Sequence, residues 1–189
     1  MRRIGEISAV ILLLSVSRLA ITIPNLEPIG AAALFGGALL SSKYLRFIIP
    51  FVALFIGDLI ISAALPSYSA HVFSPTFFAI YLSFGLTVLI GKRVIGKEAR
   101  MLNVVKAGIA SSAVFFLITN FVAWIDPVHS IYTKDLVGLL QSYAAGLAFY
   151  KNDVFGSFFF NTLMSNVGFS VLVFSVYNAY QKSFSIDVA

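Results

Sequence analysis

The stretch FIIPFVALFIGDLIISAAL, residues 47–65, decides the fold of this chain. A helix needs about 20 predominantly apolar residues to cross a bilayer, and this stretch has that length and composition. Its one charged residue is Asp58, which lies beyond the middle of the stretch. The stretch therefore predicts a transmembrane helix that carries an acid inside the membrane.

The rest of the chain has the same character. Of its 189 residues, 59% are hydrophobic and 11% are charged, which leaves too little polar surface for a water-soluble globule. We expect an all-α, polytopic membrane helix bundle that forms a single transmembrane domain over residues 1–189. About six spans are expected, at residues 5–23, 29–40, 47–65, 77–90, 104–125 and 154–176.

The segment 135–149 has a different pattern. Leu136, Leu140, Tyr143 and Leu147 recur at spacings of three and four, which indicates a short amphipathic helix before the last span. We expect it to be an interfacial amphipathic helix or a lid, because about 15 residues are few for a crossing. A seventh span at this place stays open, since it would move only the C-terminal tail to the other side.

The basic residues predict the orientation. With six spans and an internal N-terminus, ten of the thirteen Lys and Arg residues fall inside, and only Arg18, Lys134 and Lys151 fall toward the outside. The positive-inside rule then favours internal N- and C-termini. We expect an integral protein of the bacterial inner (cytoplasmic) membrane with the lipid bilayer as its surroundings.

Several function classes are excluded by the few residues outside the expected spans and by the absence of catalytic motifs. Six spans use roughly 120 residues, so no soluble ATPase, dinucleotide-binding or nucleic-acid-binding domain fits. The chain has no Cys, no H-E-x-x-H, no G-x-S-x-G and no P-loop motif. We therefore expect no enzyme, no cofactor, no metal site and no nucleic-acid partner. The energy for any transport must come from a partner or an ion gradient.

Five polar residues on five expected spans share one depth. At 1.5 Å per residue, each lies roughly 6 to 10 Å below the outer boundary. They are Arg18, Asp58, Tyr81, Asn120 and Asn161. This coincidence predicts a substrate-binding cavity open to the outside. The alternative is a buried Arg18–Asp58 ion pair, with the amides joining helices.

The outer segments could complete such a cavity. The loop 24–28, with Asn25 and Glu27 between two prolines, could gate it, and Trp124 or Tyr143 could cover it. Trp and Tyr at this level are also common interface anchors. The last span carries two rows of small polar residues that either line the cavity or join helices: Ser157, Asn161 and Ser165, and Thr162, Asn166 and Ser170. Ser83, Thr87 and Gly91 form a similar row, for which helix packing is the default interpretation.

Small residues mark the second expected span. Ala32 and Gly36 form a small-xxx-small pair, as do Ala33 and Gly37. Such pairs let another helix approach closely. The pair predicts either an internal helix crossing or a docking face for a partner subunit.

Several motifs together resemble a known family. They are PNLEPIGA at 24–31, ALFGGA at 33–38, Asp58-Leu59, YLSF at 81–84, TNF at 119–121 with Trp124, Ser142-Tyr143-Ala144, and Asn152 with Gly156 and Phe159-Phe160. The chain resembles DUF6580, a family of small bacterial membrane proteins whose suggested role is transport. The resemblance covers almost the whole chain.

In size, span count and topology this family is similar to the S components of energy-coupling-factor (ECF) transporters. Those six-helix proteins hold a vitamin or related micronutrient and work with a transmembrane coupling subunit and two ATPases. The resemblance implies a solute site in the polar layer, a gate at 24–28 and docking through Ala32 and Gly36. S components typically carry the docking motif on the first helix, whereas here it lies on the second.

The sequence therefore predicts a membrane protein that binds a vitamin-like or other small solute, as an S-component-like subunit of an uptake transporter. Arg18 and Asp58 would match the charge of the solute, while Tyr81, Asn120 and Asn161 would hydrogen-bond it. The alternatives are a structural or accessory subunit of a larger membrane complex and a stand-alone ion-coupled carrier.

Overall fold

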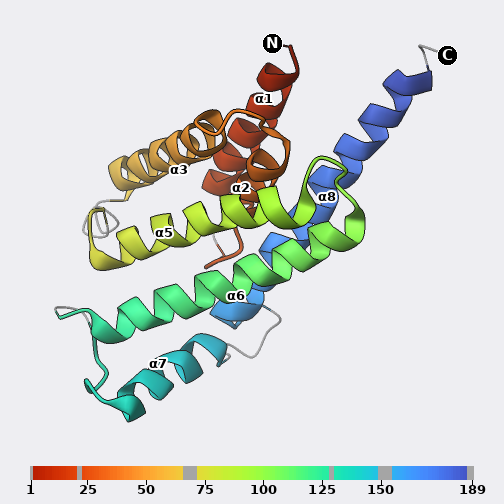
Figure 1. Cartoon of the computed structure of the whole chain (residues 1–189). Coiled ribbons are helices and arrows are strands. Elements are labelled where there is room, and N and C mark those ends of the chain that lie inside the picture. The colour runs from red at the N-terminus through yellow and green to blue at the C-terminus, as the bar shows by residue number, and fades with distance from the viewer. Residues whose placement is uncertain (1, 21–22, 66–71, 128–129, 149–154, 187–189) are drawn as a thin grey trace.

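A computed structural model describes residues 2–20, 23–65, 72–127, 130–148 and 155–186. The expectation of an all-α fold is confirmed: the regular elements of these residues are helices (Figure 1). The α-helices are α1 (Arg2–Ser17), α2 (Ile29–Leu39), α3 (Leu45–Ala64), α5 (Pro75–Ile90), α6 (Met101–Ile125), α7 (Leu136–Leu147) and α8 (Phe158–Ile186). A 3-10 turn, η1 (Arg18–Ala20), extends α1, and a π-helical turn, η2 (Gly91–Ile95), extends α5.

Four of the described helices are long and apolar enough to cross a membrane. They cover Leu45–Ala64, Pro75–Ile95, Met101–Ile125 and Phe158–Ser183. Many of their large apolar side chains face outward, among them Leu82, Leu117 and Leu172, each more than half exposed. A lipid-facing surface has this composition, so the fold is compatible with an integral membrane protein.

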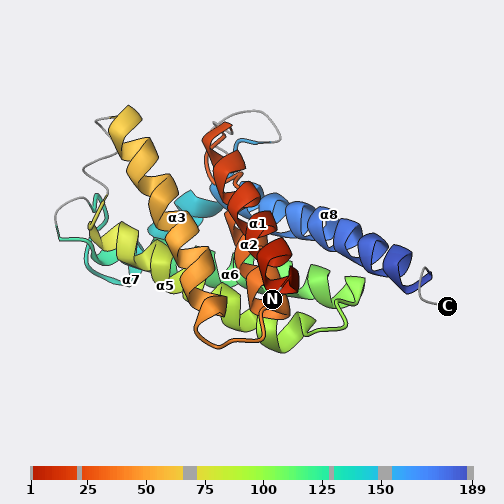
Figure 2. The same cartoon turned by 90° about the horizontal axis from the view of Figure 1, so that it is seen from above.

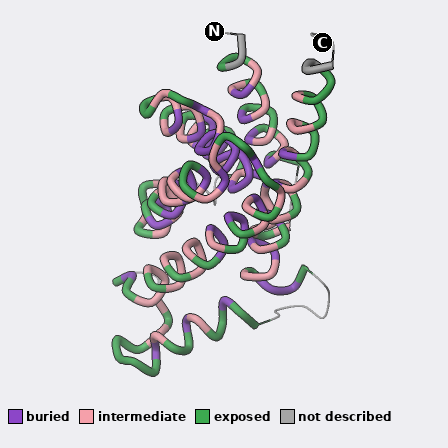
Figure 3. The backbone as a smooth tube through the Cα atoms, turned by 45° about the vertical axis from the view of Figure 1, so that its right-hand side comes forward, coloured by how far each residue is buried: buried purple, intermediate pink, exposed green. Residues whose placement is uncertain are grey.

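The helices at the two remaining expected spans are shorter than these four. Helix α2 has 11 residues and is about 16 Å long, roughly half of a hydrocarbon core of about 30 Å. Helix α1 has 16 residues before η1 continues it. Six crossings therefore stay a prediction. The N- and C-terminal ends of the chain lie at the same end of the molecule in Figures 1 and 3.

Helix α2 is the centre of the bundle. It packs against α1, α3, α5, α6 and α8, and its residues 30–38 are all buried (Figures 2 and 3). A Cβ atom at Gly37 would collide with the backbone carbonyl of Val88 in α5, and one at Gly91 would collide with the carbonyl of Leu34. Glycine at these positions lets α2 and α5 cross with their backbones in contact.

The apolar core surrounds α2 on both sides. Phe35 of α2 and Phe174 of α8 pack edge to face, with ring centroids 5.2 Å apart, beside Ile11 of α1. On the other side, Leu54 of α3 and Phe84 of α5 form a second cluster with α2. The second cluster packs α3 and α5 against α2, and Tyr81 of α5 packs against this cluster.

The expected helix before the last span is present as α7. Asp135 caps its first turn by accepting a hydrogen bond from the backbone N–H of Gly138 at 2.8 Å. The helix lies along α6 at the end of the molecule away from α1 (Figure 1). Its place at a membrane interface stays a prediction.

Candidate functional site

Four charged or polar side chains from four segments meet in one group, which we call the ionic centre. Arg18 of η1 donates from Nη1 to Asp58 Oδ1 of α3 at 2.7 Å, and its Nε lies 2.7 Å from Glu27 Oε2. Tyr81 of α5 donates from its hydroxyl to Asp58 Oδ2 at 2.8 Å. The ionic centre thus joins η1, α3 and α5 to the loop 24–28.

Burial explains why these groups are paired. The side chains of Arg18 and Asp58 are 8% and 4% exposed, and an unpaired charge at such a place would cost several kcal/mol. Glu27 differs, since its side chain is 30% exposed. Burial raises the pKa of the Glu27 carboxyl, and the nearby positive charge of Arg18 partly opposes this effect.

A cavity of about 220 Å³ adjoins the ionic centre. Arg18, Asn25 and Glu27 line one side, α2 contributes its first two residues, and α8 contributes a polar face. The other walls come from α3, α5 and α6. The remaining lining residues are Ile29, Gly30, Leu54, Ile80, Phe84, Thr87, Phe115, Thr162, Ser165 and Asn166.

The polar face of α8 fixes the loop and the start of α2. The Ser165 hydroxyl donates to the backbone carbonyl of Glu27, and Asn166 Nδ2 donates to Ser112 Oγ of α6 at 3.1 Å. A Cβ atom at Gly30 would overlap the Asn166 side chain, so a larger residue there would displace Asn166. These contacts make the cavity wall a preorganised set of polar groups.

The proposed gate residues lie at the cavity. Asn25 and Glu27 both line it, and Asn25 has a positive φ of 60°. Asn161 lies behind this loop and not in the cavity wall. Its Nδ2 donates to the carbonyls of Pro24 at 2.8 Å and Phe155 at 2.9 Å, so it ties the loop to α8.

Of the seven predicted binding residues, only Arg18 lines the cavity. Asp58 and Tyr81 belong to the ionic centre without lining the cavity, and three further predicted residues contact other parts of the protein. Asn120 donates to the Phe116 carbonyl of its own helix and faces Gly146 of α7. Tyr143 of α7 donates to the Leu117 carbonyl at 3.0 Å, and Trp124 donates to the Thr133 carbonyl at 2.8 Å. None of Asn120, Trp124 and Tyr143 is among the lining residues. They join α6 to α7 and to the segment before it.

Ala32 and Gly36, the expected docking pair, lie inside the bundle. Ala32 is fully buried, and a Cβ atom at Gly36 would sit 3.0 Å from both Ile11 of α1 and Pro50 of α3. In this structure the pair forms an internal crossing. A separate coupling subunit would need another face of the molecule, which corrects the expected docking role of these two residues.

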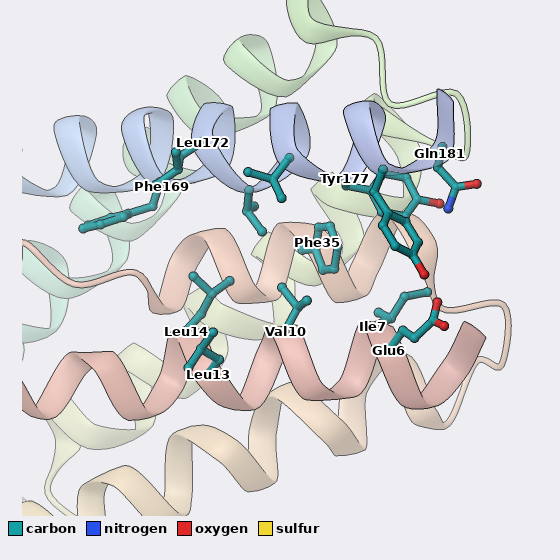
Figure 4. A pocket seen from close by; sticks show the side chains of 13 residues that line it. Glu6, Ile7, Val10, Leu13, Leu14, Phe35, Phe169, Leu172, Tyr177 and Gln181 are labelled. Atoms are coloured by element: carbon teal, nitrogen blue, oxygen red, sulfur yellow. The ribbon is translucent and has the colours of Figure 1, made fainter. Parts of the chain in front are cut away.

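A larger cavity, of about 490 Å³, lies elsewhere. It is a groove between α1 and α8 that reaches Phe35 of α2 (Figure 4). Apart from Glu6, Tyr177, Tyr180 and Gln181, its lining is aliphatic or phenylalanine. A polar solute would find few partners there. We therefore place the candidate solute site at the smaller, polar cavity.

Parts of this cavity carried a signal in the sequence and parts did not. The rows on the last span contain Thr162, Ser165 and Asn166, all of which line the cavity. Phe84 and Phe115 gave no signal, because an aromatic residue in an apolar helix does not reveal which way it faces.

Among the described residues, no group of three or more His, Cys, Asp or Glu could hold a metal ion.

Comparison with protein families agrees with the motifs quoted above. The chain matches the model of DUF6580, a family of unknown function, over residues 1–186. The chain belongs to the DUF6580 family. Comparisons with curated proteins and with solved structures found no match. Of the motifs that carry the DUF6580 resemblance, 24–31 supplies four cavity-lining residues, namely Asn25, Glu27, Ile29 and Gly30.

Proposed function

We propose that this DUF6580 protein binds a small polar solute in the cavity beside the ionic centre, as the substrate-binding subunit of an uptake transporter. The observation that carries the proposal is the cavity itself. It is lined by a carboxylate, a guanidinium, two amides and three hydroxyl-bearing side chains, yet it retains about 220 Å³ of space. Polar groups that only join helices would explain this lining but would not explain the empty volume between them.

The volume limits the size of the solute. With a water molecule occupying about 30 Å³ of liquid, the cavity corresponds to roughly seven waters. A compact vitamin-like or micronutrient molecule is of this order, whereas a peptide or a lipid is not. Convergent polar groups in a preformed, partly apolar pocket are typical of small-molecule sites.

The wider role belongs to the same proposal. The protein would reside in the bacterial inner membrane and would pass its solute on with a transmembrane coupling subunit and ATPases, in the manner of S components. The 189 residues supply no ATPase of their own. Because Ala32 and Gly36 are buried, the coupling subunit would contact the outer faces of the bundle.

An accessory role is the second candidate, and one observation favours it. Arg18, Asp58 and Tyr81 pair with one another, so they would also serve simply to lock η1, α3 and α5 together. In that role the cavity would hold water, and the protein would copurify with a fixed partner.

A cavity-filling substitution tests the proposal. Thr87 lines the cavity and donates to the Ser83 carbonyl of its own helix, whereas Thr119 makes the same bond to the Phe115 carbonyl outside the cavity. Thr87→Met and Thr119→Met are therefore matched variants. Each is extracted from its own cells in mild detergent beside the wild type, and all three are compared by native mass spectrometry.

We expect a solute of low mass to be retained by the wild type and by Thr119→Met and to be lost from Thr87→Met. A wild type that carries no solute and always retains the same protein partner would overturn the proposal in favour of the accessory role. Uptake into liposomes that contain this protein alone, driven by an ion gradient, would instead show the stand-alone carrier.

A further inference from the structure

The ionic centre has an unbalanced charge. It combines one guanidinium, Arg18, with two carboxylates, Glu27 and Asp58, so its formal charge with both acids ionised is −1. No other charged residue lines the cavity. The N-terminus of α2, which reaches the cavity at Ile29 and Gly30, contributes a partial charge of about +0.5 and leaves the balance negative.

The two carboxylates have different positions. Asp58 is 3% exposed, receives bonds from Arg18 and Tyr81, and does not line the cavity. Its position suits it to hold Arg18 in place. Glu27 lines the cavity and is 30% exposed, so it is the carboxylate that a solute reaches.

The remaining walls suit an organic cation. Phe84 and Phe115 line the cavity together with hydroxyl and amide groups of α5 and α8. Aromatic rings attract ammonium groups, and the attraction is stronger where water is excluded. The backbone carbonyl of Glu27 accepts a hydrogen bond from Ser165, and its carboxylate lies 2.7 Å from Arg18 Nε, so both ends of the residue have a partner at the cavity wall.

We propose that the solute is a small organic cation whose ammonium group binds between the Glu27 carboxylate and the rings of Phe84 and Phe115, all of which line the cavity. This inference rests on the proposed function and specifies its substrate class. The raised pKa of Glu27 agrees with it, because a bound cation would restore the ionised carboxylate that burial disfavours.

Three probes of one shape and different charge test the inference. Choline carries a quaternary ammonium, 3,3-dimethyl-1-butanol replaces its nitrogen with carbon and is neutral, and 3,3-dimethylbutanoate is an anion of similar size. Binding is measured by isothermal titration calorimetry on the purified full-length protein. We expect choline to bind at least about tenfold tighter than the alcohol, and the carboxylate not to bind.

Three variants of glutamate residues show whether Glu27 is responsible for the preference. Glu27→Gln should lose the preference for choline, whereas Glu98→Gln should keep it, because Glu98 is an exposed partner of Arg100 outside the cavity. Glu27→Asp retains the charge and should retain the preference. The melting temperature of each variant without probe confirms that it is folded.

The outcomes separate the two proposals. Equal or tighter binding of the alcohol or the carboxylate by the wild type overturns the cationic class while a solute site stands. If none of the three probes binds, the molecule retained in native mass spectrometry decides. A retained cation supports the inference, a neutral or anionic molecule overturns it alone, and a protein without solute overturns both proposals.

Discussion

Replacing Asp58 with asparagine tests the ionic centre most severely, because the side chain keeps its shape and loses only its charge. In the native structure Asp58 accepts from Arg18 at 2.7 Å and from Tyr81 at 2.8 Å, and it is 3% exposed. Breaking a buried ion pair from one side costs about 3 to 5 kcal/mol. Arg18 retains Glu27 as a second partner at 2.7 Å, so we expect the lower end, about 3 kcal/mol.

The assay is thermal unfolding in one mild detergent, followed by the fluorescence of Trp124, the single Trp of the chain. For a chain of this size, about 3 kcal/mol corresponds to a decrease in Tm of roughly 6 to 12 °C. Glu98→Gln is the control, because the Glu98–Arg100 pair has side chains 72% and 75% exposed and contributes at most about 1 kcal/mol. Equal Tm values for Asp58→Asn and Glu98→Gln would refute the reasoning.

Three further changes have expected outcomes. Gly37→Ala should lower the Tm in thermal unfolding, because the new Cβ atom would collide with the Val88 carbonyl. Gly168→Ala should leave the Tm equal or raise it, because a Cβ atom at Gly168 would meet open space. The pKa of Glu27 in the folded protein is raised above 4.5, so ionisation of this carboxyl opposes folding. The Tm of the wild type should therefore fall relative to that of Glu27→Gln as the pH rises from 4.5 through the folded-state pKa. A constant difference between the two Tm values across this range would contradict the prediction. The pKa of Asp135 is lowered, chiefly by the hydrogen bond that its carboxylate accepts from the backbone N–H of Gly138 in α7. The cap should therefore be lost as the pH falls below 3.8. At neutral pH, Asp135→Ala should speed amide hydrogen exchange in α7.

Counting depth along the expected helices grouped three of the four residues of the ionic centre, although as solute-binding residues, with an Arg18–Asp58 ion pair only as the alternative. Arg18, Asp58 and Tyr81 lie at one depth by residue number, and the structure joins all three. Depth does not give direction around the helix axis. Asn120 has the same depth, yet its side chain faces Gly146 of α7. That direction follows from the packing of α7 on α6, which the depth of Asn120 does not reveal.

Other features needed the three-dimensional packing. The small residues of α2 predicted a close helix crossing, but composition could not tell whether the other helix belonged to this chain; Gly37 and Val88 show that it does. Glu27 lies in a loop, where no periodicity indicates a direction, so its contact with Arg18 was not foreseen. The prediction of six spans also stays open, since α2 has only 11 residues.

A ligand-bound structure of the protein extracted from its own cells is the most direct test of the solute site. At a resolution that shows side chains, the account predicts non-protein density in the cavity between Glu27, Phe115 and Asn166. Density only in the groove between α1 and α8, or a cavity that holds ordered water alone, would contradict it.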